Sequence, residues 1–126
     1  MTSHLLTGVR PYGEDPTDIL ITDGTITAIG PDAEAKAPAD VQRHDLDGLI
    51  ALPRLVDIHT HPREPGGESA ETIYSGTRAA AVGGYTAVFA MANTTPVQDN
   101  AGVVEQVLRL GREAGWVDVH PVGAVS

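Results

Sequence analysis

The sequence places one aspartate and two histidines in the pattern D-x-H-x-H, as Asp57, His59 and His61. Side chains two residues apart on a strand point to the same face, so an extended segment over residues 55–61 would project both imidazoles together at its carboxyl end. Two imidazoles in this arrangement could hold one metal ion. The same pair could also be two half-exposed histidines at the edge of a strand.

The absence of cysteine narrows the kind of metal site that the sequence can form. Without thiolates there are no disulfides and no Cys-rich metal centres, so any metal has to be held by histidine and carboxylate. Structural zinc sites are usually closed and rich in cysteine, whereas catalytic sites use histidine and carboxylate and leave a position for water. The residue types therefore favour a catalytic site.

Two blocks of the sequence resemble the dihydroorotases of the cyclic amidohydrolase superfamily. The first is DIHTHPREPG, which begins at Asp57, and the second is GGYTAVFAMANTTP, which ends at Pro96. The resemblance implies a zinc enzyme, with one or two ions, that interconverts N-carbamoyl-L-aspartate and L-dihydroorotate in de novo pyrimidine (UMP) biosynthesis. It makes His59 and His61 the first two metal ligands.

The resemblance also implies substrate-binding roles for His61, Arg63 and Asn93. A guanidinium and an amide suit the carboxylate of this substrate, and Arg63 separates dihydroorotases from hydantoinase-like relatives that share the histidine pair. Without the resemblance, Arg63 would be a solvated loop arginine paired with a neighbouring glutamate, and Asn93 would be a turn residue that caps its own backbone. Asp57 is expected to orient a ligand or support the strand, because two imidazoles already occupy the outer positions.

Two positions depart from the family's pattern. Arg54 stands where the family usually has glycine, and a positive φ at this position would cost an arginine about 1 kcal/mol. Pro62 replaces a usual aliphatic residue, and because proline restricts the residue before it, we expect His61 and Arg63 to be re-aimed. His120 lies short of the end of a predicted strand and is interpreted as structural.

The chain has 126 residues, fewer than the roughly 250 of a complete eight-stranded α/β barrel. The resemblance implies that the remaining metal ligands and the general acid/base lie beyond Ser126, so no catalytic residue is expected within this chain and its zinc binding is expected to be weak or absent. Three hypotheses remain. The chain is part of a dihydroorotase and inactive by itself, a truncated or degenerate non-catalytic partner protein, or another cyclic amidohydrolase of the hydantoinase or allantoinase type.

Residues 1–52 have the pattern of β hairpins. The expected elements are a strand over residues 4–10, a hairpin over 18–30 that turns at Asp23-Gly24, a loop over 31–40 and a strand near 46–52. The resemblance makes this region an incomplete β-sandwich segment. Neither His4 nor His44 has a metal partner at useful sequence spacing, so this region is not expected to bind a ligand.

Residues 53–126 alternate strands and helices, which predicts a β-α-β-α-β unit of the α/β class. The expected elements are strands over 55–61, 85–91 and 116–125 and helices over 70–82 and 101–114. Ser69 is the predicted N-cap of the first helix, and glycines are predicted to end both helices. The resemblance makes this unit the incomplete start of an amidohydrolase (β/α)8 TIM barrel.

The charge balance excludes some classes of partner. Seventeen acidic residues against eight basic ones give a formal charge of -9, which disfavours nucleic acid. The amino-terminal segment has no basic-then-apolar pattern and no apolar run is long enough for a membrane span, which predicts no membrane association and a cytoplasmic location. A small-molecule substrate is the expected ligand. The resemblance further implies a homodimer or association with aspartate carbamoyltransferase.

Overall fold

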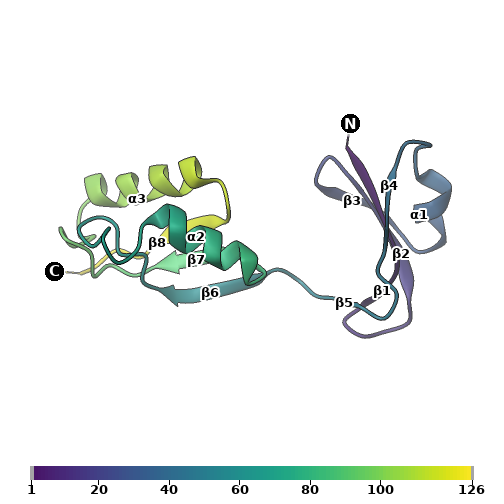
Figure 1. Ribbon diagram of the computed structural model, residues 1–126, viewed down its shortest axis with the longest axis horizontal. Helices are drawn as coiled ribbons and strands as arrows, with labels where there is room; N and C mark the ends of the chain where they lie inside the picture. The colour runs from purple at the N-terminus through teal and green to yellow at the C-terminus, as the bar shows by residue number, and fades with distance from the viewer. Residues whose placement is uncertain (1, 126) are drawn as a thin grey trace. The chain divides into compact units, whose positions relative to one another are not determined.

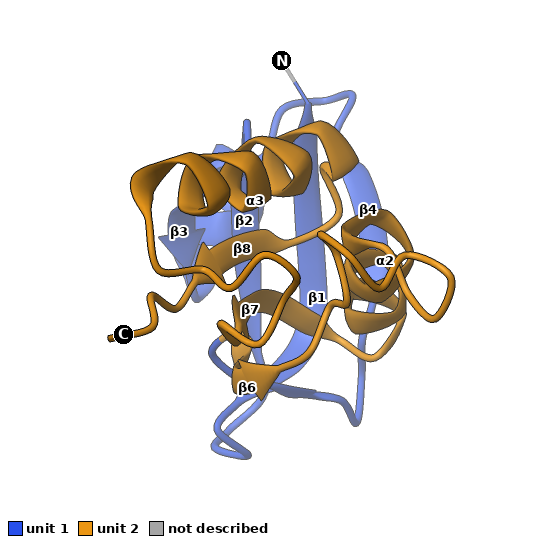
Figure 2. Cartoon of the chain, turned by 90° about the vertical axis from the view of Figure 1, so that its left-hand side faces the viewer, with its two compact units in different colours: residues 1–53 blue, residues 54–126 orange. Residues whose placement is uncertain are grey.

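The computed structural model describes residues 2–125 and divides the chain into two units, Met1–Pro53 and Arg54–Ser126 (Figure 2). The boundary predicted from the sequence falls one residue before this division. Each unit has a hydrophobic core of its own. No helix among residues 2–125 combines the length and the apolarity needed to cross a lipid bilayer.

The first unit is a sheet organised around its first strand. Its strands are β1 (Ser3–Pro11), β2 (Thr17–Thr22), β3 (Thr25–Ile29), β4 (Gln42–Asp45) and β5 (Ile50–Ala51). The order is β3-β2-β1-β4, with β1–β2 and β2–β3 antiparallel and with β4 and β5 parallel to β1 (Figure 1). The predicted hairpin is confirmed. It turns at Asp23 and Gly24, whose positive φ angles of 47° and 78° suit a two-residue turn.

Two predictions for this unit are wrong. The segment expected to be a loop contains a short helix, α1 (Pro31–Lys36), because proline is favourable at the first helical position and Ala33 is buried against Leu5 and Leu20. The strand expected near residues 46–52 is instead β4 and β5 with a turn between them, where Gly48 has a φ of 80°.

The first unit also brings two histidines together. His4 on β1 and His44 on β4 lie with Nδ1 of the first 3.0 Å from Nε2 of the second. Sequence spacing alone did not reveal that these two histidines are neighbours. Because β1 pairs in parallel with β4, His4 and His44 become neighbours although they are 40 residues apart in the sequence. No local sequence pattern reveals this contact.

The second unit has the predicted alternation of strands and helices. Its elements are β6 (Leu55–Thr60), α2 (Ile73–Val82), β7 (Tyr85–Ala90), α3 (Ala101–Ala114) and β8 (Asp118–Pro121). The strands are parallel in the order β6-β7-β8. Within residues 54–125 they form an open sheet with free edges at β6 and β8, and the β-α-β-α-β unit is confirmed. That this unit is the start of a TIM barrel stays a prediction.

Both helices pack on the same face of this sheet (Figures 1 and 2). The core between the layers is formed by Ile73 of α2, Val107 of α3, Val88 and Ala90 of β7, and Val119 of β8. Outside this core, Ile58 of β6 is 74% exposed. The carboxyl ends of the three strands and the loops that follow them are the part of the unit that positions the candidate site.

The ends of the helices follow local signals with one exception. α3 spans the predicted residues 101–114 and ends at Gly115, whose φ is 67°. α2 begins three residues later than predicted, because Thr72 rather than Ser69 is its N-cap. The Thr72 hydroxyl accepts from Ser75 N (3.1 Å), and the Glu64 carboxylate accepts from Ile73 N (2.8 Å), so two side chains satisfy the first free donors.

Candidate metal and substrate site

The two histidines of the D-x-H-x-H pattern lie side by side where β6 ends. His59 is the second-last residue of β6, and His61 is the first residue after the strand. Their ring centroids are 5.1 Å apart and the rings meet edge to face at 64°. His59 is exposed and His61 is half-buried, so solvent reaches both residues at the carboxyl end of the strand.

Asn93, in the loop after β7, holds the ring of His61. The Oδ1 atom of Asn93 lies 2.9 Å from Nδ1 of His61. Because an amide oxygen only accepts, this contact places the ring proton on Nδ1 and leaves the lone pair of Nε2 available to a ligand. The alternative in which Asn93 caps its own backbone does not hold. Its amide nitrogen remains a donor for a second partner.

Asp57 acts on the backbone of the site. Its Oδ1 atom accepts a hydrogen bond from the backbone N–H of His59 at 3.0 Å. The carboxylate therefore fixes the main chain that carries the first imidazole.

The loops that follow β6 and β7 are fastened to each other. Thr95 N donates to Pro65 O at 3.0 Å. Gly66 has a φ of 94° and packs so closely on Thr95 that a Cβ at this position would overlap the Thr95 carbonyl oxygen and lie 2.7 Å from its Cβ. The fastening keeps Asn93 beside His61, because both belong to these two loops.

Arg63 lies on the surface of the first of these loops. Among residues 2–125 its guanidinium forms no ion pair and no hydrogen bond, so the interpretation as an arginine paired with neighbouring acids is not supported. The two acidic neighbours have other partners: Glu64 caps α2, and Glu68 accepts from Gly66 N at 2.8 Å. That backbone hydrogen bond holds the pKa of the Glu68 carboxyl below its usual value.

Two hollows meet at His61. One, of about 470 Å³, is lined by His61, Met91, Ala92, Asn93, Val97 and Ala124. The other, of about 240 Å³, lies between β6 and α2, and Asp57, His61 and the buried Pro62 are among its lining residues. The first hollow brings a candidate ligand and an amide side chain together on an apolar surface, which is the usual composition of a small-molecule site. Arg63 does not line either hollow.

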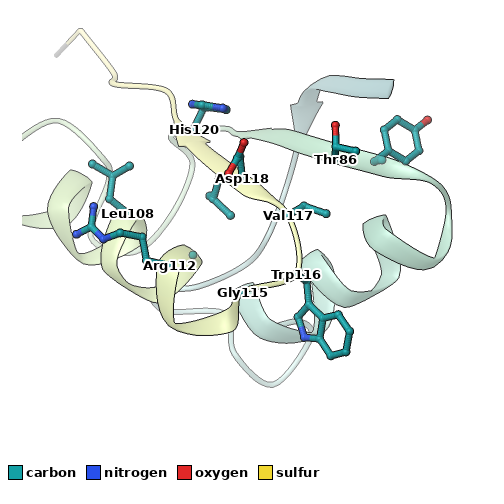
Figure 3. A pocket seen from close by; sticks show the side chains of 11 residues that line it. Thr86, Leu108, Arg112, Gly115, Trp116, Val117, Asp118 and His120 are labelled. Atoms are coloured by element: carbon teal, nitrogen blue, oxygen red, sulfur yellow. The ribbon is translucent and has the colours of Figure 1, made fainter. Parts of the chain in front are cut away.

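A third hollow, of about 490 Å³, follows the free edge of β8 beside α3. Figure 3 shows Asp118 and His120 on β8 at this hollow, with Trp116 pointing away from the strand. The ring of His120 stacks on Phe89, with centroids 4.9 Å apart, which agrees with its interpretation as structural. None of the four candidate ligand and substrate residues lines this hollow.

Arg54 does not carry the backbone strain that its replacement of glycine suggested. Non-glycine residues with positive φ occur, among residues 2–125, only at Tyr12 and Asp23. Arg54 instead pairs with Asp118 on β8, with Nη1 3.3 Å from Oδ2. The expected penalty is therefore wrong, because the main chain at Arg54 avoids the conformation that favours glycine.

Gln98 is a buried residue of this region that the sequence did not single out. Its side chain is fully buried, and Nε2 lies 3.2–3.3 Å from the carbonyl oxygens of Ala90, Met91 and Val122. Gln98 therefore joins the end of β7 to the segment after β8. A glutamine in a predicted loop gives no local signal of burial, so only the tertiary structure reveals this role.

The side chains at the candidate site supply some, but not all, of the ligands that a zinc ion needs. Two neutral imidazoles are suitable ligands, and the Asn93 contact selects the tautomer that frees Nε2 of His61. Within residues 2–125, no group of three or more His, Cys, Asp or Glu side chains could hold a metal ion. His59 and His61 therefore supply two ligands of a site that needs at least one more.

Sequence comparisons connect the chain to a protein family. A family model described as Dihydro-orotase-like matches residues 48–126. A dihydroorotase from Streptomyces coelicolor is 53% identical over 126 residues, and one from Mycobacterium tuberculosis is 56% identical over 125 residues. The matches cover 100% and 98% of this chain but 29% of each relative. The chain thus spans less than a third of these curated relatives.

Solved structures that share the fold of this chain include two hydantoinases. An L-hydantoinase (dihydropyrimidinase) from Arthrobacter aurescens matches 98% of this chain and 28% of its own, with a TM-score of 0.80 and 24% identity. A D-hydantoinase from Thermus sp. matches 97% of this chain and 27% of its own, with a TM-score of 0.68 and 24% identity. At this identity the likeness establishes the fold alone.

Proposed function

Because the chain belongs to the dihydro-orotase-like family, we propose that it carries the first part of a zinc-dependent dihydroorotase site. The reaction is the reversible interconversion of N-carbamoyl-L-aspartate and L-dihydroorotate. The observation that carries this proposal is the cluster at the end of β6, where Asn93 holds His61 beside His59. The names of the relatives, all dihydroorotases among those compared, support the substrate.

His59 and His61 are the proposed metal ligands, and Asn93 sets the tautomer of the second. A zinc ion bound there would polarise an amide carbonyl and lower the pKa of water enough to provide hydroxide near neutral pH. Asp57 contributes by fixing the backbone of His59 through its 3.0 Å hydrogen bond. His59 and His61 supply two of the ligands that such a site needs, and the family resemblance implies that the general acid/base lies elsewhere in the complete protein. We therefore propose that the chain by itself is inactive.

The substrate carboxylate is the proposed partner of Arg63 and Asn93. Arg63 is exposed and has no other partner in the described part of the chain, and the Asn93 amide nitrogen is a free donor. A guanidinium on a carboxylate forms two charge-assisted hydrogen bonds, which an uncharged cyclic amide cannot offer. Specificity for dihydroorotate over an uncharged cyclic amide therefore depends on Arg63.

A chimera tests the assignment. The 126 residues replace the aligned segment of the Streptomyces coelicolor relative, and hydrolysis of dihydroorotate and of an uncharged cyclic amide is measured with zinc. We expect Arg63→Met to lower kcat/KM for dihydroorotate roughly 10- to 100-fold, the equivalent of about 1.5–3 kcal/mol, and to change the second substrate little. Arg109→Met, on the surface of α3, is the matched control.

Equal losses on the two substrates would remove the dihydroorotase assignment and favour another cyclic amidohydrolase. The 126-residue chain alone is assayed in both directions with zinc, next to a His59→Ala/His61→Ala variant. Turnover above that variant would show that the chain assembles a complete site and would contradict its proposed inactivity.

A further inference from the structure

A second pair of imidazoles lies in the first unit, whereas the candidate site belongs to the second. His4 Nδ1 and His44 Nε2 are 3.0 Å apart, the ring centroids are 5.2 Å apart, and the ring planes differ by 35°. His44 is exposed and His4 is half-buried. Neither residue belongs to the two sequence blocks that define the family resemblance, so the proposed function leaves this pair unexplained.

The sheet holds the two rings at this spacing. In the parallel ladder, His4 is opposite Gln42 and Leu6 is opposite His44, so the two histidines are diagonal neighbours on one face. Leu5, on the other face of β1, is buried in the core with Ala33 of α1. A side-chain hydrogen bond from Thr7 Oγ1 to the carbonyl of His44 adds a further link between the strands (3.2 Å).

We propose that His4 and His44 form a binding site for a divalent transition-metal ion, independent of His59 and His61. Metal–imidazole bonds of about 2.0–2.1 Å at angles between roughly 90° and 110° place two ligating nitrogens about 2.9–3.4 Å apart. The observed separation of 3.0 Å lies in this range. An ion replaces the shared hydrogen when both rings rotate so that their in-plane lone pairs converge on it.

The proton balance permits this exchange. In the free pair, one of the two facing nitrogens carries the proton and the other accepts it. In the metal complex both facing nitrogens use their lone pairs, and that proton moves to the outer nitrogen of the same ring. Two neutral imidazoles thus bind the ion without net release of a proton, and binding is lost when acid protonates either ring.

The donor set also decides which ions are preferred. No third His, Asp or Glu joins the pair within residues 2–125, so water fills the remaining positions. Affinity for such a nitrogen site follows the general order in which Cu²⁺ binds more tightly than Ni²⁺ or Zn²⁺. The formal charge of -9 favours cations in general. A bound ion links β1 to β4 and stabilises this unit by mass action.

Cu²⁺ titration of the whole 126-residue chain tests the site. In the His59→Ala/His61→Ala variant, calorimetry is expected to show one Cu²⁺ site, and electron paramagnetic resonance is expected to show two ligating imidazoles. Adding His44→Gln should weaken Cu²⁺ binding at least tenfold and leave one imidazole. His44→Gln is decisive because it leaves His4 and the amino terminus, which can also bind copper, in place.

Circular dichroism and the exchange rates of the β1 amides establish that the His44→Gln chain is folded. If the His44→Gln chain is unfolded, His44→Asn replaces it in the titration. The number of imidazoles that bind Cu²⁺ is then also measured in the protein in which His44 is unchanged. The proposal is overturned when His44→Gln leaves the Cu²⁺ affinity unchanged, or when the spectra show a single imidazole before His44 is replaced. Loss of binding in the His59→Ala/His61→Ala chain would equally refute an independent site.

Discussion

Gly66 and Gly84 offer a matched pair of substitutions that measures how tightly the two site loops are fastened. Both glycines have positive φ, 94° and 85°. A Cβ on Gly66 would overlap the carbonyl of Thr95, whereas a Cβ on Gly84 would have Leu55 Cδ1 as its nearest neighbour at 4.0 Å. Alanine at the two positions therefore introduces the same backbone strain, and a steric clash only at Gly66.

The magnitude follows from these two contributions. Positive φ costs an alanine about 1 kcal/mol at either position. Overpacking against a neighbour adds about 1–3 kcal/mol at Gly66 alone. We therefore expect Gly84→Ala to lower the free energy of unfolding by about 1 kcal/mol and Gly66→Ala to lower it by roughly 2–4 kcal/mol. To relieve the clash, the loop with Asn93 has to move away from His61.

Urea unfolding followed by tryptophan fluorescence measures both variants, because the single tryptophan, Trp116, lies in the second unit. The nitrogen chemical shifts of the His61 ring provide a second readout, recorded above the pH range in which imidazoles are protonated. Gly84→Ala should keep the tautomer with the proton on Nδ1. Gly66→Ala should yield a mixture of the two tautomers, because the 2.9 Å contact with Asn93 is lost.

Equal losses of stability in the two variants would show that the loops do not approach as closely as described. A Gly66→Ala chain with an unchanged His61 tautomer would show that the fastening of the loops does not position Asn93. Either result would refute the link between Gly66 and the candidate site.

Two further substitutions concern stability. Gln98→Leu keeps the side-chain volume but leaves the carbonyl oxygens of Met91 and Val122 without the amide donor. We expect urea unfolding to show a free energy of unfolding lower by about 2–4 kcal/mol. An unchanged urea midpoint would contradict the described contacts. Arg54→Gly removes an exposed ion pair with Asp118 and no backbone strain, so we expect a loss of less than about 1 kcal/mol. A gain in stability in the same assay would restore the strain hypothesis.

Local signals in the sequence were sufficient for much of the fold. The hairpin turn at Asp23 and Gly24 and the end of α3 at Gly115 depend on residues that tolerate positive φ, and both were predicted. The alternation of strands and helices after Pro53 follows from apolar periodicity. The H-x-H spacing similarly places His59 beside His61, because neighbouring residues on one strand determine it.

Features that depend on contacts distant in sequence were not predicted. The start of α2 shifts to Thr72 because Glu64, from the preceding loop, supplies an additional cap. α1 is stabilised by burial of Ala33 and has no side-chain cap of its own. The contact of His61 with Asn93 required the register of β6 against β7, which periodicity does not specify.

The position of β1 in its sheet has a consequence for synthesis on the ribosome. β1 is translated before the other strands of its sheet, and the β2–β3 hairpin that follows can cover one of its edges early. Its other edge pairs with β4, which arrives about 40 residues later. At roughly 5–20 residues per second, that edge stays open for about 2–8 seconds in each nascent chain. During this interval unpaired backbone groups are exposed, and neighbouring nascent chains on one messenger RNA can pair through them.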